Sequence, residues 1–216
     1  MTFRDRRDAG QRLAEALQGL RNRRPLVLAI PRGGIVVGYE VARALDAPLD
    51  VVVPRKLRAP YNPELAIGAV ARDGTVYLDT PVAGTLKVTD EYLKEEIAYQ
   101  LEEIHRRMRL YRGDRPPPDL SGRAAIVVDD GIATGSTMIA ALRATRAAGP
   151  ATLVAAVPVA PPEGVESLRR EADELVCLFT PMLFYAVGQF YDDFAQTSDE
   201  QVIALLRRRE QEMHGG

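Results

Sequence analysis

The sequence predicts an α/β domain built on a doubly wound parallel sheet, and three observations support this fold class. Apolar runs with the length and β-branching of buried strands recur at residues 26–30, 49–53, 124–128, 153–159 and 174–179. Segments whose apolar residues recur at helical spacing lie between most of these runs. Two of the runs continue directly into a glycine-rich turn that opens a helix. The 216 residues suffice for one such domain with a sizeable core.

The composition argues against a protein that binds nucleic acid, spans a membrane or is secreted. The chain has 28 Lys and Arg against 30 Asp and Glu, and this net charge of −2 gives no global attraction to nucleic acid or membrane. No apolar run approaches the roughly 18 residues that a membrane span needs, and the charged start MTFRDRRDAG is not a secretory signal. The single Cys177 has no partner for an internal disulfide, so we expect a reducing, cytoplasmic location.

The N-terminal part predicts a helix, a strand and an anion-binding turn. Residues 5–20 predict an amphipathic helix, because apolar residues recur along one side. The strand at 26–30 leads at once into the sequence PRGG at 31–34 and then into a helix. Arg32 offers a planar set of donors for phosphate oxygens, and the two glycines allow backbone N–H groups to approach an anion. This turn therefore predicts an anion site.

The next strand is followed by a basic segment and a hairpin. The strand at 49–53 ends in the basic segment 54–60, at the carboxyl end of a strand, where open parallel sheets bind their ligands. In the segment 61–79, Asp73 and Gly74 lie between two apolar stretches, which predicts a β-hairpin.

Residues 89–112 predict the longest helix of the chain. Its acids come early and its bases late, which suits the helix dipole. Apolar residues recur at steps of three and four for nearly three heptads, which favours a packing or dimer-forming helix over one that binds nucleic acid. The sequence leaves the role of this helix open. Residues 114–123, DRPPPDLSGR, predict a stiff linker into the next strand.

Residues 124–137, AAIVVDDGIATGST, are the centre of the predicted site. The helix that follows the turn presents unpaired N–H groups and the positive end of its dipole, and Gly135 removes a Cβ that would keep an anion away. Hydroxyl donors lie around the same place, on Thr134, Ser136 and Thr137. A phosphate fits this turn.

The two acids in this stretch need a separate explanation, because carboxylates repel phosphate. Asp129 and Asp130 are suited to sugar hydroxyls, which donate to them, or to a Mg²⁺ that bridges both. The local chemistry therefore predicts a phosphorylated sugar with a metal. The chain then continues with strands at 153–159 and 174–179, a helix at 163–171 between them and a last helix at 199–210.

Residues 126–137 resemble the phosphoribosyl pyrophosphate (PRPP) signature of the type I phosphoribosyltransferases. The resemblance implies one domain, residues 1–216, with the parallel sheet of that family. It also implies a β-hairpin flap and an inserted helix within 57–120, and a small hood at 180–198. The hood segment PMLFYAVGQFYDDF carries five of the thirteen aromatic residues, eight Tyr and five Phe, of the chain.

The resemblance also implies roles for individual residues. Asp129 and Asp130 would hold the ribose, and with Arg32 they form the expected catalytic set. The expected 5′-phosphate loop is Ala133, Thr134, Gly135, Ser136 and Thr137. The expected pyrophosphate site is Arg32, Gly33, Gly34, Arg55 and Lys56, where the Arg-Lys pair is similar to that of adenine phosphoribosyltransferases.

The hood is similar to that of purine phosphoribosyltransferases, in which an aromatic ring stacks on the base and an Asp supports a metal. Tyr185 takes the stacking position and Asp192 the acidic one, with Phe184 and Asp193 as alternatives one step away. The metal that the resemblance implies is Mg²⁺, with ligands Asp129, Asp130 and Asp192.

The activity implied by the resemblance is Mg²⁺-dependent transfer of a 5-phosphoribosyl group from PRPP to a nitrogenous base, with release of pyrophosphate, in nucleotide salvage. A homodimer is expected, without nucleic acid or membrane as partner. Hypoxanthine-guanine enzymes carry an Asp where this chain has Ala133, so adenine, uracil and orotate remain as acceptors. The alternative is a regulator that senses PRPP without catalysis and binds nucleic acid or a protein. The sequence does not decide between turnover and binding alone.

Overall fold

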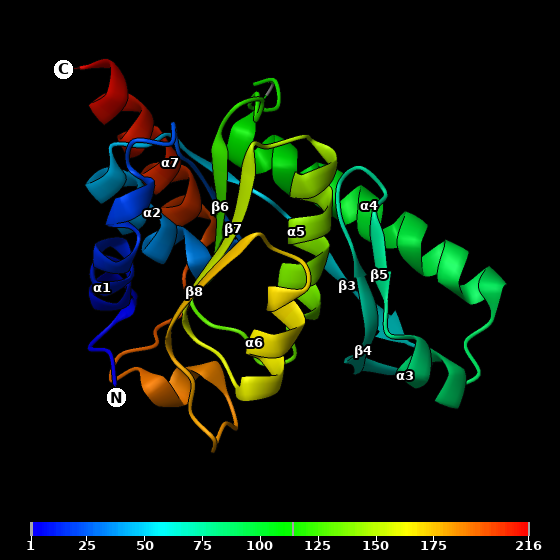
Figure 1. Cartoon of the computed structure of the whole chain (residues 1–216). Helices are drawn as coiled ribbons and strands as arrows, with labels where there is room; N and C mark the ends of the chain where they lie inside the picture. Colours follow the sequence, from blue (N-terminus) through cyan, green and yellow to red (C-terminus); the bar gives the residue numbers. More distant parts are fainter. Residues whose placement is uncertain (1, 114, 216) are drawn as a thin grey trace.

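A five-stranded parallel sheet forms the centre of the molecule, with helices on both of its faces (Figure 1). The structure is a computed structural model that describes residues 2–113 and 115–215, except for the side chain of Glu64. The strand order is β2-β1-β6-β7-β8, and every pairing is parallel. The bounds are β1 (Leu26–Ala29), β2 (Leu49–Val51), β6 (Ala124–Val128), β7 (Thr152–Val159) and β8 (Glu174–Phe179). The predicted doubly wound sheet is confirmed.

Alternation along the strands divides the core into two layers. Side chains of successive strand residues point to opposite faces, so Ile126 packs on one side and Val127 on the other. One face is covered by α1 (Arg6–Ala16) and α2 (Gly34–Leu45), and the opposite face by α5 (Ser136–Ala147) and α6 (Pro162–Arg169). The three central strands are buried on both faces, which explains why their sequences are continuous apolar runs.

A smaller antiparallel sheet lies beside this core (Figure 1). It consists of β3 (Arg55–Ala59), β4 (Asn62–Val70) and β5 (Val76–Leu78), and the short helix α3 (Thr80–Thr85) follows. The predicted hairpin at Asp73 and Gly74 is confirmed, because Val70 pairs with Val76 and Gly74 has a φ of 84°. Neither β3 nor α3 was predicted from the sequence.

The predicted long helix is α4 (Asp90–Arg112), and the side chain of Thr89 caps its first turn. Its apolar side packs on β3 and on α7 (Asp199–His214), so α4 joins the small sheet to the C-terminal helix. The linker after it runs past a β-bridge between Ser121 and Pro150 into β6, and its first residue, Asp114, lies outside the described residues. The short 3₁₀ helices η1 (Gln18–Leu20) and η2 (Val187–Phe190) complete the fold.

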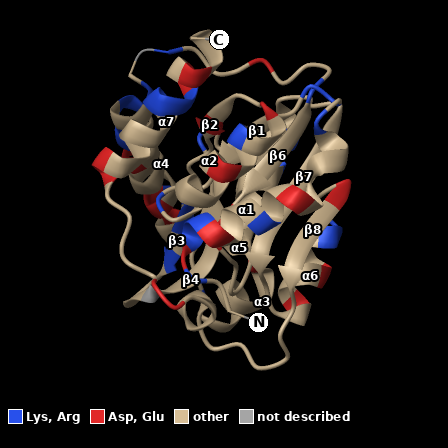
Figure 2. Cartoon of the chain, turned by 90° about the vertical axis from the view of Figure 1, so that its left-hand side faces the viewer, with Lys and Arg blue, Asp and Glu red and all other residues tan. Residues whose placement is uncertain are grey.

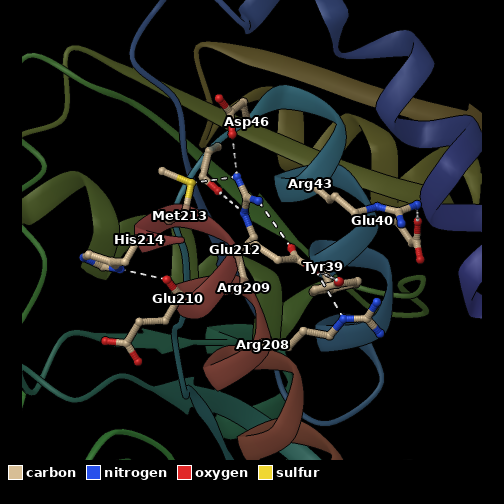
Figure 3. Close-up of polar contacts among 11 residues, drawn as sticks. Tyr39, Glu40, Arg43, Asp46, Arg208, Arg209, Glu210, Glu212, Met213 and His214 are labelled. Carbon is tan, nitrogen blue, oxygen red and sulfur yellow. Dashed lines mark hydrogen bonds and ion pairs between the residues drawn. The ribbon is translucent and has the colours of Figure 1, made fainter. Parts of the chain in front are cut away.

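Arg209 fastens α7 to the C-terminal end of α2 (Figure 3). Its side chain is 4% exposed; Nε donates to the carbonyl of Ala47 at 2.9 Å and Nη2 to the carboxylate of Asp46 at 2.9 Å. Asp46 ends α2 in the left-handed conformation. A guanidinium at this place satisfies a carbonyl and complements the negative end of the α2 dipole. One turn further along α7, Glu212 accepts a hydrogen bond of 2.6 Å from the hydroxyl of Tyr39 on α2.

Charge is dispersed over the molecule. Figure 2 shows Lys and Arg interspersed with Asp and Glu over the helices and strands on the side that faces the viewer. None of the helices in the described part of the chain has the length and apolarity needed to cross a membrane.

We predict that Arg209→Ala lowers the free energy of unfolding by about 2–3 kcal/mol, because the buried carbonyl and the carboxylate lose their donor. The matched control is Arg208→Ala, which removes an exposed ion pair with Glu212 and costs about 1 kcal/mol or less. Urea unfolding followed by circular dichroism measures both variants. Equal losses for the two variants would contradict a special role for Arg209.

Candidate active site

The two turns predicted to bind a ligand leave the same edge of the central sheet. The strand order reverses between β1 and β6, because β1 continues to β2 on one side and β6 to β7 on the other. Ala29 at the end of β1 lies in register with Val128 at the end of β6. The turns that follow, PRGG and DD, therefore meet at the switch point of the sheet. Open α/β sheets bind their ligands at this point.

The turn after β6 presents an uncapped helix N-terminus. Gly135 lies at the N-cap of α5 with a φ of 82°, and no described side chain caps the first turn of the helix. The hydroxyls of Thr134 and Ser136 lie 3.4 Å apart beside these free N–H groups. Free backbone donors, a positive dipole end and two hydroxyls together make a favourable environment for an anion.

A cleft of about 260 Å³ opens at this turn. It brings together residues from β1, β3, the motif and the hood: Ile30, Pro31, Lys56, Asp129, Gly131, Ile132, Ala133, Thr134, Gly135, Thr137, Met138 and Val187. Four of the five predicted phosphate-loop residues line it, and the fifth, Ser136, is buried behind them. The carboxylate of Asp129 and the ammonium of Lys56 are the charged groups among these lining residues. The cleft thus combines an anion-binding turn with one acid and one base.

The PRGG turn packs directly on the two acids. A Cβ on Gly33 would lie 1.9 Å from Oδ2 of Asp130, and a Cβ on Gly34 would lie 2.9 Å from Cα of Asp129. Both glycines are needed because the two turns approach so closely, with no requirement for a positive φ. The side chain of Arg32 is half-buried, and no hydrogen bond or ion pair of it is found within the described part of the chain.

Asp130 faces away from the cleft, into an ion pair with Arg6. Nε of Arg6 donates to Oδ2 of Asp130 at 2.6 Å, and the two side chains are only 11% and 13% exposed. Arg6 also donates to the carbonyl of Ala195 at 2.6 Å, and its guanidinium lies 3.8 Å from the ring centre of Phe194. The hydroxyl of Tyr191 donates to the backbone carbonyl of Asp130 at 2.5 Å. Helix α1, the hood and the motif therefore meet at Asp130.

Arg6 is a site residue that was not predicted from the sequence. It lies 124 positions before Asp130, in a helix whose charges resemble an ordinary solvated face. No local pattern marks it, because the pair forms only when α1 packs beside the motif. The N-terminal segment is held in place by a bridge of Phe3 to Tyr191 in the hood.

The electrostatics of the two acids differ. Burial, and then the neighbouring carboxylate of Asp130, raise the pKa of Asp129 well above its usual value. Its oxygen accepts a hydrogen bond from the backbone N–H of Asp130 at 2.9 Å, which acts in the opposite direction. Asp130 has the compensating guanidinium and Asp129 does not. Asp129 is therefore the carboxylate suited to a donor or cation that arrives with a ligand.

The predicted Arg-Lys pair is separated by the pleat of β3. Lys56 lines the cleft, whereas Arg55 lies against α4, where its Nε donates to Gln100 at 3.1 Å. Arg58 is bound to the same helix by two hydrogen bonds of 2.9 Å to Glu96. Neighbouring strand residues point to opposite faces, so the two side chains of the pair lie on different sides of β3. Arg55 is not among the residues that the structure brings to the cleft.

The hood contributes Val187 to the cleft lining. Phe184 packs in the hood core, with its ring centre 5.1 Å from that of Phe190, whereas Tyr185 is 85% exposed. Of the two base-stacking candidates, Tyr185 is therefore the one whose ring is free to contact a ligand. Neither ring lines the cleft itself.

The predicted set of three metal ligands is not assembled. Within the described residues, no three His, Cys, Asp or Glu side chains form a group that could hold a metal ion. Asp130 is paired with Arg6, and Asp192 is exposed in a hood segment whose backbone is bonded to Phe3. Asp129 alone fits Mg²⁺, which proteins often bind by one or two carboxylates together with ligand phosphates and water.

Comparisons with known proteins show which proteins this chain is similar to. A family model described as phosphoribosyl transferase domain matches residues 5–194. A Mycobacterium tuberculosis relative, whose name assigns it provisionally to the phosphoribosyl transferases, is 47% identical over 206 residues, which are 95% of this chain and 46% of that protein. A crystal structure of the protein TT1426 from Thermus thermophilus is 49% identical, with a TM-score of 0.82, over 96% of this chain and 99% of that one. A Nocardioides relative named uracil phosphoribosyltransferase is 31% identical over 151 residues, 65% of each chain.

The fold and the cleft define a doubly wound α/β domain with a ligand site at its switch point. Within that class, the match over residues 5–194 identifies the family: the chain belongs to the phosphoribosyl transferases. The resemblance to type I phosphoribosyltransferases seen in the sequence is thereby confirmed, and so is the predicted fold class. The chain spans about half the length of the Mycobacterium tuberculosis relative.

We predict that Gly33→Ala lowers the free energy of unfolding by about 1–3 kcal/mol, because the added methyl group collides with the carboxylate of Asp130. The matched control is Gly19→Ala, where a Cβ meets nothing within 4 Å and stability should stay within about 1 kcal/mol. Thermal and urea unfolding measure both. A neutral Gly33→Ala would contradict the close packing of the two turns.

We predict that Arg6→Ala lowers the free energy of unfolding by about 3 kcal/mol, because it leaves the carboxylate of Asp130 buried without its partner. Arg7→Ala is the control on the next position of the same helix. Its side chain is 64% exposed, and its buried partner Glu40 keeps an ion pair with Arg43 at 2.8 Å, so the loss should be about 1 kcal/mol or less. The double variant Arg6→Ala, Asp130→Asn should recover part of the lost free energy of unfolding. Urea unfolding of the unmodified chain and of these three variants tests this.

Proposed function

We propose that this domain transfers the 5-phosphoribosyl group of PRPP to a nitrogenous base and releases pyrophosphate. The observation that carries the proposal is the uncapped N-terminus of α5, which opens into a cleft beside the carboxylate of Asp129. A site that offers N–H donors for a phosphate and an acceptor for sugar hydroxyls supports binding of a sugar phosphate. Membership in the phosphoribosyl transferase family supports the same substrate class.

In this proposal, the 5′-phosphate is held by the first-turn N–H groups of α5 and by the hydroxyls of Thr134, Ser136 and Thr137. Asp129 accepts hydrogen bonds from the ribose hydroxyls. Asp130 faces away from the cleft, and its ion pair with Arg6 holds the turn in place. The fixed positions of these groups set the direction in which C1′ of the ribose faces the incoming base.

Lys56 and Arg32, together with the N–H groups of Gly33 and Gly34, are proposed to hold the pyrophosphate. As the bond from C1′ to pyrophosphate breaks, negative charge grows on the leaving group, and fixed cations stabilise that charge. Mg²⁺, when bound with PRPP, supplies further positive charge at the pyrophosphate, with Asp129 as the carboxylate available to it. The nitrogen of the base forms the new bond to C1′ and loses its proton to solvent.

Uracil is the acceptor that we propose to test first. The Nocardioides relative is named uracil phosphoribosyltransferase, and so is a Streptomyces griseus relative that is 47% identical over 57 residues, 26% of this chain and 27% of that protein. Ala133 provides no carboxylate for a proton of a 6-oxopurine, which favours another base. Tyr185 is the proposed stacking residue. The homodimer, the cytoplasmic location and the role in salvage stay predictions.

Calorimetric titration with PRPP and Mg²⁺, followed by addition of purine and pyrimidine bases while pyrophosphate is measured, tests the proposal. Release of pyrophosphate with one base would establish a transferase and identify its acceptor. Binding of PRPP without release for any base would instead support the PRPP-sensing regulator. Absence of PRPP binding would contradict both functions.

We predict that Asp129→Asn lowers the affinity for PRPP in the presence of Mg²⁺ at least tenfold, without lowering stability at pH 7. The pKa of Asp129 is raised in the folded protein, so its ionised form opposes folding above the unfolded pKa, and a neutral amide relieves this cost. Asp130→Asn is the matched control, and it should lower stability because Arg6 loses its partner. Calorimetry and urea unfolding measure the two effects, and a stability loss in Asp129→Asn alone would contradict the assignment.

A further inference from the structure

A second cavity of about 400 Å³ lies at the opposite end of α5 from the proposed active site. Its walls come from the last turn of α5, the end of α4, the linker, and the tip of the β4–β5 hairpin, which converge at the top of Figure 1. The first residues of α5 line the cleft, whereas Ala144, Thr145, Ala147 and Ala148 line this cavity. A helix of this length spans about 18 Å, so a small ligand in one site does not reach the other.

The walls of this cavity are mainly apolar. They include Met108, Pro117, Pro118 and Leu120, together with valines at and just after the end of β2 and small residues of α5. The charged residues of this lining are Arg72, Asp73 and Arg112. The volume lies within the range of cavities that hold small organic ligands, about 300–1,000 Å³, and such sites combine apolar walls with a few placed polar groups.

An adjoining cavity of about 130 Å³ provides those polar groups. Its described lining consists of Arg72, His105, Met108, Arg109, Arg112, Gly113 and Arg115, and it contains no carboxylate. Arg72, Met108 and Arg112 line both cavities, so the two cavities adjoin each other. The result is an apolar cavity whose entrance carries several guanidinium groups.

Arg112 at the base of these cavities has unused hydrogen-bonding capacity. It is 7% exposed; its Nη2 forms an ion pair with Asp50 at 3.1 Å and donates to the carbonyl of Pro116. Its Nε is buried and has no hydrogen-bond partner among the residues that the structure describes. An unsatisfied buried donor is unfavourable, and an acceptor brought by a ligand is one way of satisfying it.

Among the described residues, the charges around the two cavities leave a positive excess. Asp50 pairs with Arg112, and Arg115 pairs with Glu210 and with carbonyls at the end of α4. Arg72 and Arg109 are exposed, and no ion pair or hydrogen bond of either side chain is found among the described residues. Asp73, beside Arg72, is occupied by Thr75, which donates to it from its hydroxyl at 2.7 Å. Two guanidinium groups thus remain free at the entrance.

We propose that this pair of cavities is a second ligand site, for a small organic phosphate with an apolar or aromatic body. Arg72 and Arg109 hold the phosphate at the entrance, with Arg112 behind them, because guanidinium groups match phosphate oxygens in geometry and charge. The apolar body lies against Met108 and the prolines of the linker. The site joins the hairpin tip to α4 and α5, so an occupant contacts three elements at once.

Methionine-methyl NMR of the full chain tests this proposal, because Met108 lines the second site and Met138 lines the cleft. Phenyl phosphate is the probe, and we expect a saturable shift of the Met108 signal. Inorganic phosphate should bind at least fivefold more weakly, because it lacks the ring. The exposed Met182 serves as a reference that should not move. A Met108 signal that stays unchanged, or equal affinities for the two compounds, would overturn the proposal.

The double variant Arg72→Ala, Arg109→Ala should weaken the Met108 response to phenyl phosphate at least tenfold and leave the response of Met138 to PRPP unchanged. Both side chains are exposed, so the variant is expected to fold. The charge-matched control is Arg21→Ala, Arg170→Ala, which removes two exposed arginines from other elements and should retain the response. An unaltered Met108 response in the first variant would overturn the site. If PRPP does not shift the Met138 signal of the unmodified chain, that result counts against the proposed function and not against the second site.

Discussion

The ion pair of Arg6 with Asp130 is the interaction on which the arrangement of the candidate site depends. It is nearly enclosed, and its guanidinium also contacts the ring of Phe194 and the carbonyl of Ala195. Burial of two charges is unfavourable unless both are paired and bonded, and here these conditions are met by three separate parts of the chain. The first helix, the hood and the motif after β6 therefore hold one another in place. Gly33 completes the unit, since a side chain at that position would displace the carboxylate.

Because of this ion pair, the two acids have different environments, although they look equivalent in the sequence. The carboxylate of Asp130 is neutralised inside the protein, whereas that of Asp129 lies in the cleft with a raised pKa. A buried carboxylate without a partner is costly, and proteins keep such a cost where a ligand relieves it. The asymmetry supports a site in which one acid organises the backbone and the other meets the ligand.

Much of the fold and part of the site could be predicted from local pattern. The strand at 124–128, the acids and the glycine-rich turn follow one another, so strand, turn and helix start are encoded within fourteen residues. The separation of Arg55 from Lys56 was not predictable in this way, because it depends on which face of β3 packs on α4. Arg6 was missed for a related reason. Its partner is distant in sequence and is defined only by the packing of α1.

The long helix α4 connects these observations, although the sequence left its role open. Near its start, Glu96 and Gln100 bind the arginines of β3 and so hold the strand that presents Lys56 to the cleft. At its far end, Arg112 lines the second cavity and Arg109 the adjoining one, beside the hairpin that belongs to the same small sheet. One rigid helix therefore contacts both the strand at the cleft and the hairpin at the second cavity. Both proposed sites therefore lie against the same helix and the same small sheet.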